Sequence, residues 1–60
     1  MWNQMTAQQK HDTLVAMRVY GGSFAAYIAE AWLVADTYNS ARLAAAFPDL
    51  VEKYSTGDWV

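Results

Sequence analysis

Apolar side chains recur along the first third of the chain at roughly the period of an α-helix, three to four residues, although the spacing is not clean. Thr6 and Gln9 form the pattern of a helix-capping box just before this segment. Gly21 and Gly22 follow it, and glycine ends helices because it adopts the left-handed conformation without a steric cost. The pattern predicts a first helix between the capping box and the double glycine.

The segment 24–35 is apolar on almost all sides and contains Glu30 as its only charge before Asp36. It lacks the strict alternation of a half-buried strand, and Ser23 is placed to cap it as a helix. A helix that is apolar nearly all round is normally buried on several sides. We therefore expect a central apolar helix at about residues 24–36, with part of its surface left for a partner.

The segment 36–40 collects weak helix formers and capping residues, which predicts a break in the chain. A third helix then covers about residues 41–47, capped by Asn39 or Ser40. The competing interpretation is one continuous helix over residues 23–47.

Phe47 and Pro48 end the helix in either interpretation, because the residue before a proline is driven out of the α region. Pro48 also suits the first position of a short fourth helix. We therefore expect one all-α domain over residues 1–60. It would be a small bundle of three or four short helices around the central apolar helix.

The chain has no cysteine and a single histidine, so neither disulfides nor a structural zinc site can stabilise it. A core of this size supplies only about 3–5 kcal/mol, which favours self-association as a homodimer or a higher oligomer. Three Trp, four Tyr and two Phe exceed what so small a core accommodates, so some are expected at an interface. The residues predicted for that interface are Ala29, Trp32 and Leu33, with Trp2 and Trp59 near the chain ends.

The charge pattern excludes several classes of ligand. The net charge is −2, and the four basic residues are spread singly, whereas nucleic-acid binding needs a clustered basic face. The longest strictly apolar runs are five residues, and a membrane span needs about 20. The start of the chain also lacks the pattern of a secretory signal. We therefore expect neither nucleic acid nor membrane as a partner, and a cytoplasmic location.

Groups that could carry catalysis are sparse. His11 and Asp12 are sequence neighbours, and neighbouring side chains on a helix do not face each other. Glu30 could pair with Arg18 or Arg42, but we expect it to mark a solvated strip of its helix. The sequence therefore predicts no enzymatic activity, no cofactor and no metal.

One pattern indicates a small ligand. The segment Gly21, Gly22 and Ser23 precedes a helix, and the free amides of a helix N-terminus can bind an anion. Arg18 and Arg42 could add charge-assisted bonds to phosphate. A tight turn between helices is the simpler interpretation, and the pattern leaves open a homo-oligomeric sponge for a nucleotide immune signal.

Several short strings carry a resemblance to known proteins. They are GGSF over 21–24, AEAW over 29–32, AD over 35–36, Asn39, RL over 42–43, AFP over 46–48 and VEKY over 51–54. In these strings the chain resembles a group of short proteins encoded by tailed bacteriophages and prophages. The resemblance covers about residues 20–54, and no functional residue is carried over from it.

The resemblance implies a small phage protein made in the host cytoplasm. Small phage proteins of this kind often bind and inhibit host factors, including antiviral defences. We therefore expect a non-catalytic accessory protein that binds and inhibits a host protein, such as a component of bacterial antiviral defence. The alternatives are the nucleotide sponge and a small structural or regulatory phage protein.

Overall fold

The computed structural model describes residues 2–56 of the chain. These residues contain four α-helices and one short 3-10 helix, joined by short connections. The elements are η1 (Trp2–Gln4), α1 (Ala7–Tyr20), α2 (Gly22–Leu33), α3 (Thr37–Ala46) and α4 (Pro48–Thr56). No strand occurs among these residues. The predicted all-α class and the four short helices are confirmed.

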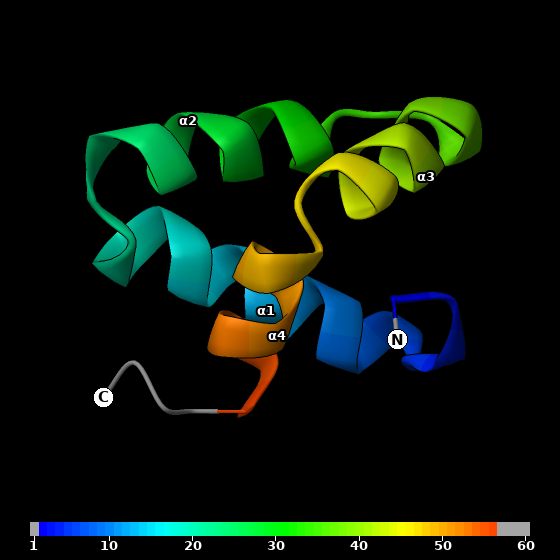
Figure 1. Ribbon diagram of the computed structural model, residues 1–60, viewed down its shortest axis with the longest axis horizontal. Helices are drawn as coiled ribbons and strands as arrows, with labels where there is room; N and C mark the ends of the chain where they lie inside the picture. The colour runs from blue at the N-terminus through cyan, green and yellow to red at the C-terminus, as the bar shows by residue number, and fades with distance from the viewer. Residues whose placement is uncertain (1, 57–60) are drawn as a thin grey trace.

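The helices are arranged around α1, which packs against both α2 and α4, and not around the apolar helix α2 as predicted. In Figure 1, α2 runs across the top of the molecule above α1, and α4 lies in front of α1. α3 lies between α2 and α4 in the chain and contacts both of these helices. The apolar helix α2 therefore covers α1 with one face and leaves its opposite face uncovered by the described helices. None of the helices in residues 2–56 is long and apolar enough to cross a membrane.

The predicted capping box begins α1. The Gln9 backbone N–H donates to Thr6 Oγ1 at 3.1 Å, and the Thr6 backbone N–H donates to Gln9 Oε1 at 2.8 Å. The helix closes where the Gly21 N–H donates to the Met17 carbonyl oxygen at 2.9 Å. Gly22 then reverses the chain with a φ of 76°. Both ends of α1 are thus set by residues identified in the sequence.

The start of α2 differs from the prediction. The helix begins at Gly22 with Gly21 at the N-cap, and no side chain caps it. Ser23 was expected as the cap, but it lies inside the first turn. The positive φ of Gly22 turns the chain early enough for the helix to start one residue before the serine.

The break after α2 is present, which excludes a continuous helix over residues 23–47. α3 nevertheless begins at Thr37, earlier than expected, because Asp36 is its cap. The Asn39 backbone N–H donates to Asp36 Oδ1 at 2.8 Å. The prediction of Asn39 or Ser40 as the cap was wrong: both lie inside the helix, and the Ser40 hydroxyl accepts a hydrogen bond from the Trp32 indole at 2.9 Å.

The core packs the start of the described chain against the end of α2. The rings of Trp2 and Trp32 pack with their centroids 4.7 Å apart. Met17 of α1 and Val51 of α4 also have almost no exposed surface. The remaining buried members of this cluster are Leu14, Ala16, Ala29 and Tyr54.

Candidate functional site

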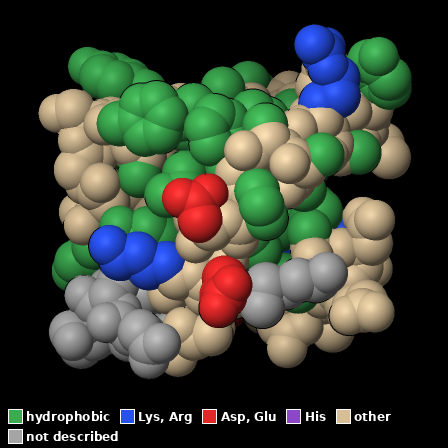
Figure 2. Space-filling model, viewed as in Figure 1, with side chains coloured by type: hydrophobic (Ala, Val, Ile, Leu, Met, Phe, Trp, Pro, Cys, Tyr) green, Lys and Arg blue, Asp and Glu red, His purple; other side chains and the backbone are tan. Residues whose placement is uncertain are grey.

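The exposed face of α2 is apolar. Phe24, Tyr27 and Val34 expose 64%, 72% and 86% of their surface, and Ala31 lies exposed between them. These residues follow one another at steps of three, four and three, so they lie on one side of a helix with 3.6 residues per turn. We call these four residues the α2 stripe. Figure 2 shows hydrophobic side chains gathered along the part of the surface that lies over α2.

A groove of about 590 Å³ adjoins the C-terminal half of the stripe. Ala31 and Val34 form one side of it, and Leu43 of α3 contributes to the other. The rest of its lining comes from Ala35, Asn39, Arg42 and Ala46. Small and aliphatic side chains therefore leave room beside the stripe for an apolar group.

The charge at this groove belongs to Arg42. Its Nη1 donates to Asn39 Oδ1 at 3.0 Å, and its guanidinium lies 5.5 Å from the centre of the Tyr38 ring. The Arg42 side chain is exposed, and Asn39 and Tyr38 fix its position. It offers a positioned positive charge to whatever enters the groove.

The N-terminal half of the stripe is held by a ring contact. Phe24 packs edge-on against Phe47, which connects α3 to α4, with the centroids 5.8 Å apart. Phe24 keeps most of its surface exposed despite this contact. The bulky end of the stripe is therefore anchored without being covered.

Most of the residues predicted for an interface lie in the core. Ala29, Trp32 and Trp2 expose 0%, 2% and 8% of their surface, so a partner cannot reach them in this conformation. Leu33 is exposed at 36%, and Trp59 lies outside the described residues. The structure thus corrects the expected interface, because Trp2 and Trp32 pack against each other in the core, with their rings tilted by 45°.

The face of α2 that was expected to pair with another copy is the face that packs inside the molecule. Ala25 and Ala29 are both buried, and small residues let two helix backbones approach closely. A Cβ placed on Gly21 would lie only 2.6 Å from the Cβ of Ala25, which shows how tightly the turn into α2 is packed. The sequence also places Phe24, Tyr27 and Ala31 on neighbouring rows of this helix, and these are the residues that the structure leaves exposed.

The residues predicted for an anion site are partly brought together. Arg18, Gly22 and Ser23 line one hollow of about 410 Å³, together with Tyr27 and Val19. They lie where the C-terminal end of α1 meets the first turn of α2.

The other two predicted anion contacts do not join them. The Gly21 N–H is used by the Met17 carbonyl oxygen, and Arg42 lines the groove beside α3 instead. The hollow therefore offers Arg18 as its one positive charge.

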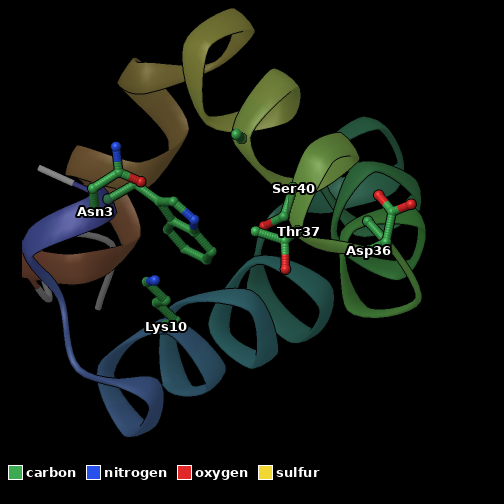
Figure 3. Close-up of a pocket in the computed structure, with 8 residues that line it drawn as sticks. Asn3, Lys10, Asp36, Thr37 and Ser40 are labelled. Atoms are coloured by element: carbon green, nitrogen blue, oxygen red, sulfur yellow. The ribbon is translucent and has the colours of Figure 1, made fainter.

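A third hollow, of about 240 Å³, is polar and lies between η1, α1 and α3 (Figure 3). The Lys10 ammonium lies 5.3 Å from the centre of the Trp2 ring. Asp36 accepts from the first turn of α3, and Ser40 accepts from Trp32. These polar groups fasten η1 and α3 to the body of the protein. Among residues 2–56, no three His, Asp or Glu side chains gather where they could hold a metal ion.

Comparison with known proteins finds no match to the chain among protein-family models, curated proteins or solved structures. Its function is therefore inferred from the surfaces described above.

Proposed function

We propose that this protein acts by binding another protein through the α2 stripe, without catalysis. The observation that carries the proposal is the exposure of Phe24 and Tyr27 on one side of α2, together with Val34 directly after its last residue. Soluble monomers rarely expose large contiguous apolar patches, and those that exist commonly mark interaction sites. Tyrosine is also among the residue types enriched at the few positions that dominate the binding energy of protein interfaces.

The stripe is suited to binding because it is already in place. The opposite face of α2 is packed through Ala25, Ala29 and Trp32, so the helix keeps its shape with or without a partner. A preformed surface loses little conformational freedom on association. Covering a large apolar side chain contributes roughly 1.5–3 kcal/mol.

The groove indicates the kind of partner. An amphipathic helix laid along the stripe would place its own apolar residues against Ala31, Val34 and Leu43, which is the helix-in-groove mode of recognition. Arg42 favours an acidic residue on the edge of such a helix. Together with the resemblance over residues 20–54, this supports a phage accessory protein that binds and inhibits a host protein, such as a component of antiviral defence.

The proposal is tested with Tyr27→Lys, which places a charge in the middle of the stripe at an exposed helical position. Gln8→Lys is the matched control, because it adds the same charge at an exposed position of α1. Proteins retained from a bacterial lysate by the parent and by each variant are compared by quantitative mass spectrometry. The retained protein is then purified and titrated by calorimetry.

We expect Tyr27→Lys to weaken this binding at least tenfold, since the loss of one buried ring is worth roughly 1.5–3 kcal/mol. Gln8→Lys should change it less than twofold. Equal binding by the parent, by Tyr27→Lys and by Val34→Lys would show that the stripe is not the binding surface.

A second candidate function is supported by the hollow that gathers Arg18, Gly22, Ser23 and Tyr27. Arg18 could bind a phosphate there while the Tyr27 ring stacks on a base, as a nucleotide sponge would require. Calorimetry against cyclic nucleotides separates the two functions. A sponge requires binding that Arg18→Ala abolishes and that Arg42→Ala, in the other groove, leaves unchanged.

A further inference from the structure

We infer that a second copy of the chain covers the α2 stripe when the target is absent, in an antiparallel pair with two-fold symmetry. The inference rests on the proposed role of the stripe as a binding surface, and it names the occupant of that surface in the free protein. Binding of the target then competes with pairing.

The stripe has a large end and a small end. Phe24 and Tyr27 are bulky, whereas Ala31 is small and the groove opens beside it. Positions 24 and 34 are centred on residue 29, and so are positions 27 and 31. An antiparallel pair therefore sets each Tyr27 against the partner's Ala31, and each Phe24 against the partner's Val34.

This arrangement places one aromatic ring in each groove. Each Tyr27 ring reaches the open groove beside the partner's Ala31. A parallel pair would instead oppose ring to ring and leave both grooves empty. The two-fold pairing thus places large residues against small ones on both sides of the axis, as the self-complementary patch of a dimer requires.

The surface is large enough for a modest dimer. At their exposed fractions, Phe24 and Tyr27 each present roughly 150 Å² of surface. With Val34 and the groove walls this amounts to roughly 500–600 Å² per copy, or about 1,000–1,200 Å² per pair. That total reaches the lower end of specific protein interfaces.

The charge of Glu30 opposes the pairing, and its position distinguishes an antiparallel pair from a parallel one. Glu30 is exposed beside the stripe and lies one residue from its midpoint. An antiparallel pair brings the two Glu30 side chains to the same flank, whereas a parallel pair keeps them on opposite flanks. Glu30→Gln should therefore tighten an antiparallel pair a few-fold, because like charges across an interface repel.

The test uses sedimentation of the purified full chain at 10–500 µM (about four to six orders of magnitude above nanomolar affinities). We expect a mass of twice the 6.7 kDa chain at the upper concentrations. Tyr27→Lys and Ala31→Glu should each be monomeric by themselves and should form a dimer when mixed, because position 27 of one chain faces position 31 of the other. Gln8→Lys should pair like the parent, and far-UV circular dichroism should show that every variant remains helical.

A parent chain that stays monomeric up to 500 µM (the tested limit, corresponding to roughly 4–5 kcal/mol of association) overturns the inference. So does dimerisation unaffected by Tyr27→Lys, and a mixture of the two variants that fails to pair overturns the antiparallel arrangement. A monomeric parent that binds its target leaves the proposed function intact. A dimeric parent whose target binding ignores Tyr27→Lys removes the proposed function and leaves the dimer.

Discussion

Replacing either of the two adjacent glycines by alanine should destabilise the protein, but for different reasons and by different amounts. A Cβ on Gly21 would lie against the Met17 carbonyl oxygen and 2.6 Å from the Cβ of Ala25. Both neighbours belong to packed helices, so neither can move aside alone. A Cβ on Gly22 meets no other atom within 4 Å, but its φ of 76° is unfavourable for any residue with a side chain.

The magnitudes follow from these contacts. Relief of the clash at Gly21 requires α1 and α2 to separate near their junction, and overpacking of this kind costs about 1–3 kcal/mol. Disturbing the hydrogen bond from Gly21 to Met17 adds about 0.5–1.5 kcal/mol. We therefore expect Gly21→Ala to lower the free energy of unfolding by about 3 kcal/mol, a factor of about 100 in the folding equilibrium.

Gly22→Ala should cost less, about 1–2 kcal/mol for the left-handed backbone alone. Gly22→Asn should cost less again, because asparagine tolerates that conformation better. Replacing glycine by alanine lowers the conformational entropy of the unfolded chain to the same extent at both positions. This contribution to the free energy of unfolding therefore cancels when the two variants are compared.

The free energies of unfolding are measured by urea titration, followed by far-UV circular dichroism and tryptophan fluorescence. All variants are compared at one protein concentration, because self-association raises the apparent stability. A Gly21→Ala variant within 0.5 kcal/mol of the parent (about a factor of two in the equilibrium) would refute the proposed close packing. A larger loss for Gly22→Ala than for Gly21→Ala would refute the assignment of the two causes.

Three further changes test the contacts between and before the helices. Ser40→Ala should lower the free energy of unfolding by about 1–3 kcal/mol, because it leaves the buried Trp32 indole N–H without its acceptor. The loss should be smaller in a Trp32→Phe background, which a double-mutant cycle measured by urea titration would show. Asp36→Ala should lower stability by about 1 kcal/mol through loss of the cap on the Asn39 amide, whereas Asp36→Ser should restore most of it. Thr6→Ala should cost a similar amount at the start of α1, measured as a lower thermal midpoint, and Thr6→Ser should not.

The parts of the fold that depend on neighbouring residues were readable in the sequence. The capping box of Thr6 and Gln9 places the start of α1, and Pro48 places the start of α4. These signals are reliable because a cap or a proline acts on backbone groups within three or four residues of itself. The break between α2 and α3 was predicted on the same basis, although Asp36 rather than Asn39 or Ser40 caps the second helix.

Which side of a helix is buried could not be predicted from residues close in the sequence. The segment that forms α2 carries apolar residues on nearly every side, so periodicity alone favours neither the side of Ala29 and Trp32 nor the side of Tyr27 and Val34. Packing against α1 decides which side is buried: α1 contacts the side of α2 on which the small residues Ala25 and Ala29 allow the two backbones to approach closely.

The sequence by itself determined where α1 begins and ends, where α4 begins, and that a break separates α2 from α3. It also determined that the chain holds more apolar surface than a small core can cover. Only the tertiary structure decided which apolar residues remain outside. Trp2 became a core residue because Trp32, thirty positions away, lies where the two rings pack against each other. Phe24, Tyr27 and Val34 became the candidate binding surface because the packing of α1, α3 and α4 leaves that side of α2 open. Contacts between distant segments set these outcomes, and a local pattern of residues does not contain them.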